Sequence, residues 1–252
     1  MGEIFTLKDF ENIHIVINYS ADNDKMPDVL ELINELCLMV NEAFPINKKE
    51  MLIIFEPQRK DPIYLRESKT IMITPHIEQW NAIVYELSHE LCHFGVIDEA
   101  PQANKWFEES ICEVASYYFL LKMAKLYHLK YLATKEEKYK RYMEFVATYS
   151  RQSENFKIFS TGDLVIGKDK ALLGVLQKNE KLREYNRYIA IKILPVFQTN
   201  PQLWECIQYL GSVDAEHPYA FLLQWNTICQ KNIGIDVYEI IQTLGWSNIL
   251  RI

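Results

Sequence analysis

Residues 70–94 read TIMITPHIEQWNAIVYELSHELCHF, and this stretch decides how the chain is expected to fold. Its first part, 70–74, is rich in β-branched residues and predicts a strand. Pro75 ends the strand, and apolar residues then recur at helical spacing over 77–94. The stretch therefore predicts a strand followed closely by a helix, with the pentapeptide His-Glu-Leu-Cys-His (89–93) near the end of the helix.

The pentapeptide has the residue types and spacing of a zinc hydrolase. His89 and His93 are four residues apart, so a helix presents both imidazoles on one face, within reach of one metal ion. Leu87 and Leu91 belong to an apolar stripe on the neighbouring face, which places the histidines beside a buried seam. Glu90 is the predicted general base, because a carboxylate next to the first His can reach a water on the metal.

A catalytic zinc site typically has three protein ligands and an open position, so a third ligand is needed. Val96 and Glu99 stand where the metzincin pattern would have Gly and His, which disfavours that class. The Gly-Thr-x-Asp segment of the aspzincin pattern does not occur in the chain. A Glu on the next predicted helix is the remaining source, and residues 106–113 (Trp-Phe-Glu-Glu-Ser-Ile-Cys-Glu) supply candidates.

With these residues, the chain resembles the gluzincins, the thermolysin-like and aminopeptidase-like zinc peptidases, over about residues 50–125. Ligand contexts such as Trp-Leu-Asn-Glu-Gly and Asn-Glu-Ala-Ile-Ser-Asp in those families both align the ligand with Glu109. The resemblance then implies that Glu113, one turn later, hydrogen-bonds a ligand His and fixes its tautomer. Fifteen residues separate His93 from Glu109, fewer than is usual, whereas the nineteen between His93 and Glu113 match thermolysin-like spacing. Glu109 is favoured as the ligand and Glu113 stays open as the alternative.

The resemblance implies a zincin-like core and a zinc-dependent metallopeptidase that hydrolyses peptide bonds through a Glu90-activated, zinc-bound water. The edge of strand 70–74 is expected to lie above the cleft and to pair with an extended peptide substrate. The alternatives are a catalytically weak or inactive zincin-like binding or regulatory protein, and a protease with one narrow target. The donor that stabilises the oxyanion is not assigned; the candidates are Tyr117, Tyr118, His217 and Tyr219.

Outside this region the pattern predicts an α+β fold: a small mixed sheet with the active-site helix, followed by a mostly α-helical C-terminal half. The predicted domains are a catalytic core over 1–130 and a helical subdomain over 131–252. Further strands are expected at 13–19, 51–55 and 63–65, the last forming a hairpin with 70–74, and further helices at 27–44, 103–129, 135–149, 169–178, 180–196, 201–210, 217–230 and 236–244.

Composition bounds the partners and the compartment. The net charge of −7 gives no support for binding nucleic acid or an anionic membrane. The expected partner, a peptide or protein substrate, is what the resemblance to zinc peptidases implies. Five cysteines without a CxxC pair predict reduced, buried thiols, with Cys92 and Cys112 as packing residues. The N-terminus has no signal-peptide pattern and no apolar run reaches transmembrane length, so a cytoplasmic location is expected. Glu86 and Glu108 are expected to be surface charges.

Overall fold

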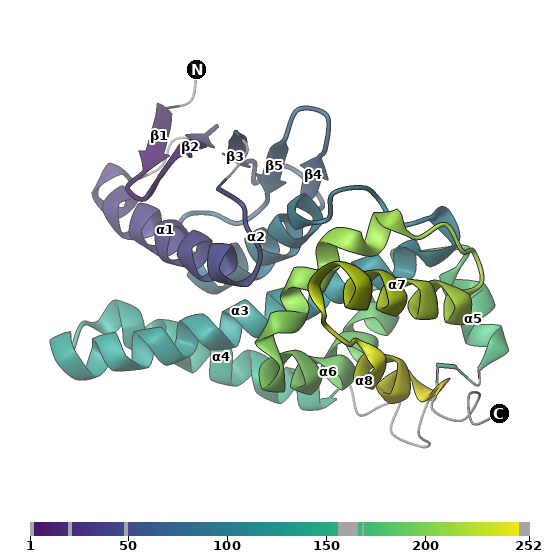
Figure 1. Ribbon diagram of the computed structural model, residues 1–252. Coiled ribbons are helices and arrows are strands. Elements are labelled where there is room, and N and C mark those ends of the chain that lie inside the picture. Colours follow the sequence, from purple (N-terminus) through teal and green to yellow (C-terminus); the bar gives the residue numbers. More distant parts are fainter. Residues whose placement is uncertain (1–2, 20–21, 48–49, 156–165, 168, 247–252) are drawn as a thin grey trace. The chain divides into compact units, whose positions relative to one another are not determined.

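A computed structural model describes residues 3–19, 22–47, 50–155, 166–167 and 169–246 of the chain (Figure 1). The chain divides into two compact units, and each unit is made of two separate stretches. The first unit is Met1–Gly95 with Ala115–Arg151, and the second is Val96–Val114 with Gln152–Ile252.

The first unit contains a five-stranded mixed sheet, so the predicted α+β class is confirmed. The strand order is β1-β2-β3-β5-β4, in which β2, β3 and β5 are parallel and the two outer strands are antiparallel to their neighbours. The strands are β1 (Glu3–Leu7), β2 (Phe10–Ile17), β3 (Met51–Phe55), β4 (Ile63–Leu65) and β5 (Thr70–Ile73).

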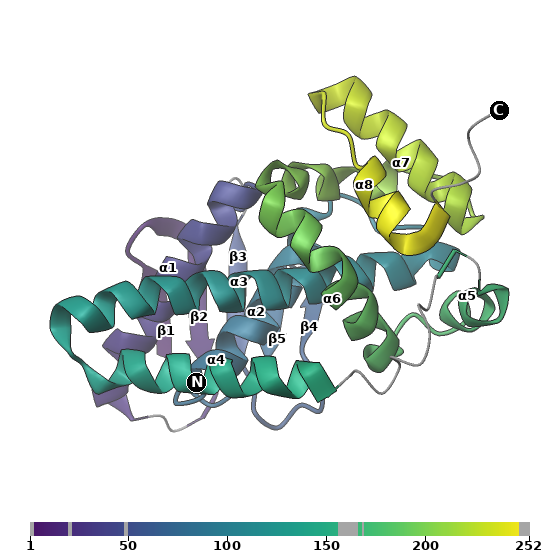
Figure 2. The same cartoon turned by 90° about the horizontal axis from the view of Figure 1, so that it is seen from below.

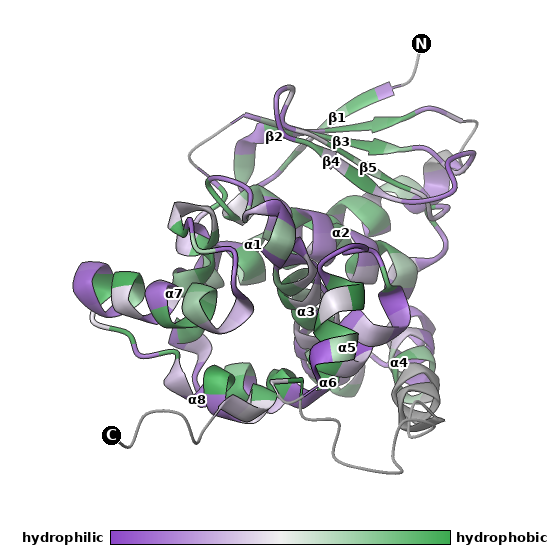
Figure 3. Cartoon of the chain, turned by 90° about the vertical axis from the view of Figure 1, so that its right-hand side faces the viewer, coloured by the Kyte–Doolittle hydropathy of each residue, from purple (hydrophilic) through white to green (hydrophobic). Residues whose placement is uncertain are grey.

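Successive side chains of each strand point to opposite faces of the sheet, and this alternation explains how the sheet packs. Ile15, Ile53 and Ile71 are register partners on neighbouring strands, and all three are fully buried. Helices α1 (Met26–Ala43) and α2 (Trp80–Gly95) lie against one face of the sheet (Figure 1), and the strands carry mainly apolar residues (Figure 3). The apolar stripes of the two helices and this inner face therefore form the core of the first unit.

The prediction that strand 70–74 provides an edge was wrong. β5 pairs with β3 on one side and with β4 on the other, so its backbone groups are used within the sheet. The predicted hairpin between β4 and β5 is confirmed, with Lys69 in the turn at a φ of 51°. On this side of the sheet the edge strand is therefore β4, a three-residue strand next to β5.

Glu86 was also predicted wrongly, as a surface charge. It is half-buried on α2, and its carboxylate accepts hydrogen bonds from the Thr74 backbone N–H (2.8 Å) and from Thr74 Oγ1 (2.7 Å). Thr74 directly follows β5, so this contact fastens the end of the strand to the middle of α2. It orients the helix that carries the pentapeptide.

The next two helices, α3 (Lys105–Thr134) and α4 (Glu137–Asn155), form a hairpin whose arms lie side by side (Figure 2). Within the first unit, the ring of Tyr127 on α3 contacts the rings of Tyr139 and Tyr142 on α4, at centroid distances of 4.9 and 5.0 Å. Burial first, and the nearby Glu35 carboxylate second, raise the pKa of Tyr127, so its phenol stays neutral.

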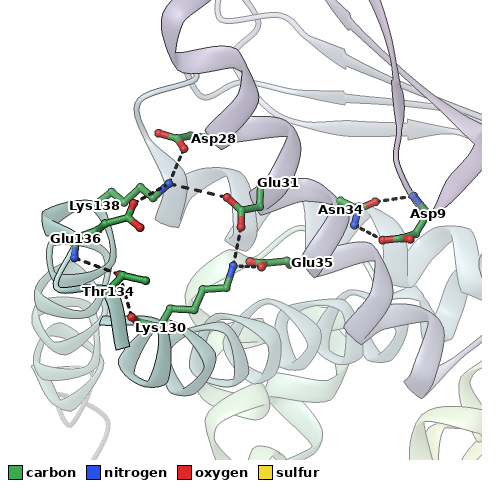
Figure 4. Close-up of polar contacts among 9 residues, drawn as sticks. All are labelled: Asp9, Asp28, Glu31, Asn34, Glu35, Lys130, Thr134, Glu136 and Lys138. Atoms are coloured by element: carbon green, nitrogen blue, oxygen red, sulfur yellow. Dashed lines mark hydrogen bonds and ion pairs between the residues drawn. The ribbon is translucent and has the colours of Figure 1, made fainter. Parts of the chain in front are cut away.

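Ion pairs join this hairpin to α1 (Figure 4). Lys130 Nζ contacts the carboxylates of Glu31 (2.7 Å) and Glu35, while Lys138 Nζ contacts Asp28 (2.6 Å). The Glu35 side chain is only 16% exposed, and its Oε2 is buried with no hydrogen-bond partner in the described part of the chain. A carboxylate in this position depends on the Lys130 ammonium to offset its desolvation.

We expect Lys130→Met to lower the free energy of unfolding by about 2 kcal/mol, because Glu35 would lose its cation while remaining largely buried. Urea denaturation followed by circular dichroism measures the change. Lys122→Met is the matched control, since its partner Glu42 is 72% exposed and water can replace the ammonium there. An equal loss of stability in the two variants would contradict this account of the Lys130 pairs.

The second unit is helical in its described residues. Its fold confirms the predicted helical character of the C-terminal half, although 201–212 form a 3₁₀ helix instead of an α-helix. Besides the first part of α3, its elements are η2 (Gln102–Asn104), α5 (Lys170–Leu176), α6 (Arg183–Thr199), η4 (Pro201–Ser212), α7 (Pro218–Ile233), α8 (Tyr238–Ile241) and a π-helical turn over Gln242–Trp246.

The domain boundary expected at residue 130 lies inside α3, and the first unit continues to Arg151. All five cysteines are buried and none forms a disulfide bond, as predicted. Burial raises the pKa of the Cys37 thiol to about 12, which keeps it protonated and unreactive. Among the described helices, none has the length and apolar character needed to cross a membrane.

Candidate metal centre

The pentapeptide forms the C-terminal half of α2. His89 and His93 are half-buried, and their rings meet edge to face with centroids 5.1 Å apart. Glu90 is 4% exposed, so its carboxylate is shielded from bulk water. The helix thus presents two imidazoles together, as their spacing predicts, with a buried carboxylate next to the first of them.

Two contacts within the first unit join α3 to α2, near the turn before His89. Ser116 Oγ donates a hydrogen bond to the carbonyl oxygen of Tyr85 (2.9 Å). The rings of Tyr85 and Tyr117 meet edge to face with centroids 5.7 Å apart. These contacts fix which residues of the two helices lie opposite each other.

Cys112 lies one turn before Ser116 on α3, which is helical without interruption from Lys105 to Thr134. Cys112 belongs to the second unit and is buried. A thiol sulfur, like an imidazole nitrogen, is a donor that suits zinc, so Cys112 is a further candidate ligand. From the sequence, Cys112 was predicted only to pack, because no second Cys stands at metal-ligand spacing.

Glu109 and Glu113 occupy different environments on α3. Glu109 is half-buried, whereas the Glu113 side chain is 8% exposed. Arg187 on α6 donates from its Nε to Oε1 of Glu113 at 3.0 Å. Nothing in the sequence points to Arg187, because it stands 74 positions beyond Glu113 in an ordinary helical pattern.

Glu108 is a third acidic residue on this helix, and its prediction as a surface charge was wrong. It is buried, and its Oε2 accepts a hydrogen bond from the backbone N–H of Ala100 at 2.9 Å. Asn104 Nδ2 donates to the carbonyl oxygens of Ala215 (2.8 Å) and Glu216 (3.1 Å). These bonds organise the short connection between α2 and α3, so the small separation of His93 and Glu109 corresponds to a compact, well-bonded loop.

The candidates for the oxyanion donor have other contacts. Tyr117 is buried against Tyr85. Tyr219 stacks on Trp246, with ring centroids 6.2 Å apart, and His217 is exposed next to the start of α7. None of these contacts assigns the role.

The edge strand lies close to the pentapeptide within the first unit. Tyr64, the middle residue of β4, packs edge to face on Phe94 of α2 with centroids 5.6 Å apart. Phe94 directly follows His93, so the outer edge of the sheet runs beside the part of α2 that carries the histidines. No other strand of the described residues pairs with this edge of β4, and an edge strand of this kind can accept an added strand.

No protein-family model, curated protein or solved structure matches this chain.

Proposed function

We propose that this protein is a zinc-dependent metallopeptidase of gluzincin type with a zincin-like core, acting in the cytoplasm. One observation carries the proposal: α2 presents His89 and His93 in ring contact, with Glu90 buried between them in the chain. Two histidines and one further ligand can hold zinc without Glu90. Glu90 is needed only for hydrolysis, so its presence supports an enzyme. Five buried thiols without a disulfide bond support the reducing compartment.

In this proposal His89 and His93 bind the metal and Glu90 moves the proton. Zinc, when bound, lowers the pKa of its water and polarises the substrate carbonyl. Glu90 takes a proton from the attacking water and delivers it to the leaving amine. The burial of Glu90 supports this role, because a carboxylate shielded from bulk water interacts more strongly with a proton donor next to it.

Glu109 is the proposed third ligand. The Arg187 guanidinium engages the Glu113 carboxylate at 3.0 Å, and an arginine pair competes with a metal for the same oxygens. That pair supports Glu109 over Glu113, which keeps the proposed role of orienting a ligand His. Cys112 is the rival for the third position, since a buried thiol on the same helix is also a ligand that suits zinc.

The proposed substrate is an extended peptide that adds to β4. Backbone pairing along an edge strand tolerates many side chains, and the contact of Tyr64 with Phe94 brings that edge next to the histidines. β4 therefore replaces strand 70–74 as the strand proposed to pair with the substrate, because both sides of strand 70–74 are already paired within the sheet.

Metal analysis of the purified protein tests the proposal. We expect about one zinc per chain in the wild type and almost none in His89→Ala, because removal of one imidazole leaves too few ligands. His128→Ala is the control, since His128 is exposed on α3. A wild-type protein that takes up no zinc, even after incubation with zinc and dialysis, overturns the proposal.

Cobalt(II) substitution separates Glu109 from Cys112 as the third ligand. With Glu109 bound, we expect no thiolate-to-cobalt charge-transfer band in the near ultraviolet, and Glu109→Gln should weaken metal binding. A band that disappears in Cys112→Ser and persists in Cys92→Ser would assign the position to Cys112 and remove Glu109. Cys92 is a suitable control because it is also a free, buried thiol and is not a proposed ligand.

A further inference from the structure

Ser116 links α3 to the turn of α2 that precedes His89. Its side chain is 0% exposed, and its hydroxyl donates to the Tyr85 carbonyl oxygen at 2.9 Å. Tyr85 is four residues before His89, so in the helix this same carbonyl accepts the backbone N–H of His89. The Ser116 hydroxyl is thereby bonded to the peptide group that sets the position of the first histidine.

The neighbouring residue on α3 makes a second contact with the same place. Tyr117 meets the Tyr85 ring edge to face at 5.7 Å. A hydrogen bond resists sliding of α3 along α2, and a ring contact from the adjacent residue resists rotation of α3 about its axis.

We infer that Ser116 is a positioning residue of the metal centre, which holds the turn of α2 that precedes His89 and thereby sets where α2 presents its two imidazoles. The inference rests on the proposed function. A hydroxyl that only fills space would affect stability alone, whereas a positioning hydroxyl controls how well the ligands converge on one ion. Residues that orient metal ligands in this way typically change metal affinity about 10- to 100-fold when they are removed.

Ser88 provides a matched comparison. It stands directly before His89, it is also 0% exposed, and its Oγ has no hydrogen-bond partner among the described residues. Ser88→Ala and Ser116→Ala remove the same atom from equally buried sites, but only the second removes a bond between the two helices. The pair therefore separates loss of packing from loss of position.

The test measures zinc affinity by competition with a chromophoric chelator, on protein shown to be folded by circular dichroism. We expect Ser116→Ala to bind zinc about 10- to 100-fold more weakly than the wild type, and Ser88→Ala to bind it equally well. Ser116→Thr keeps a hydroxyl and should bind more tightly than Ser116→Ala. Thermal unfolding of the metal-free proteins records the purely structural effect of each change.

Unchanged zinc affinity in Ser116→Ala overturns the inference, as does an equal loss in Ser88→Ala. Either result leaves the proposed function standing, because the wild type still binds zinc. A wild-type protein without zinc affinity overturns the proposed function, and this inference with it.

Discussion

Glu90→Gln is expected to lower the rate of peptide hydrolysis by about 10²- to 10⁴-fold, which is the usual contribution of a general acid–base residue. Gln has almost the same shape as Glu but cannot accept a proton from water. The zinc content of the Glu90→Gln variant should match that of the wild type, because Glu90 is not a proposed ligand. The measurement is turnover of a broad peptide library by mass spectrometry, with metal analysis of the same samples.

Glu78→Gln is the control for the loss of one carboxylate. Glu78 precedes α2, its side chain is 48% exposed, and it pairs with Lys25 at the surface, so its change should leave turnover unaffected. A zinc-loaded wild type that cleaves neither the library nor any protein of a cell lysate would favour a binding or regulatory protein. Cleavage of one lysate protein alone, lost in Glu90→Gln, would identify a protease with one narrow target.

Gly211→Ala is expected to destabilise the second unit by about 3 kcal/mol or more. A Cβ at Gly211 would lie 1.8 Å from the backbone oxygen of Asp98 and 2.2 Å from its carbonyl carbon. No rotamer change relieves an overlap with backbone atoms, so η4 or the connection between α2 and α3 has to move. Urea denaturation followed by tryptophan fluorescence reports the change, since Trp204 lies buried in η4.

Gly174→Ala is the matched control for this substitution. Gly174 lies within α5, and a Cβ there would meet nothing within 4 Å. Ala in a helix loses less conformational entropy on folding than Gly, so this variant should gain roughly 0.5–1 kcal/mol. If Gly211→Ala were as stable as the wild type, the close approach of η4 to Asp98 would be refuted.

Local chemistry explains which elements could be predicted. Strand 51–55 was placed correctly because each of its residues is apolar, and α1 was found because Pro27 and the spacing of its apolar residues mark its start and its buried face. The strand β1 (Glu3–Leu7) was missed because it mixes polar and apolar residues and is mostly exposed, with Ile4 70% exposed. It gives no pattern of burial from which a strand could be predicted.

The wrong expectations for Glu86 and Glu108 share a physical cause, which is that burial of a polar group depends on hydrogen-bond partners outside its own helix. Glu86 and Glu108 have the residue type of a surface charge, yet Thr74 and Ala100 provide hydrogen bonds that allow them to leave water. Strand 70–74 was predicted to provide an edge of the sheet, and this was wrong because the sequence of one strand does not show how many strands will pair with it. Strand order is decided by the whole sheet.

For this protein, the sequence by itself determined most of the strands and helices and the presentation of His89 and His93 on one face of α2, because helical periodicity is a property of adjacent residues. Only the tertiary structure decided that β4, and not β5, is an edge strand and that Arg187 pairs with Glu113. Both depend on how whole elements pack against one another, and a local pattern carries no record of that packing.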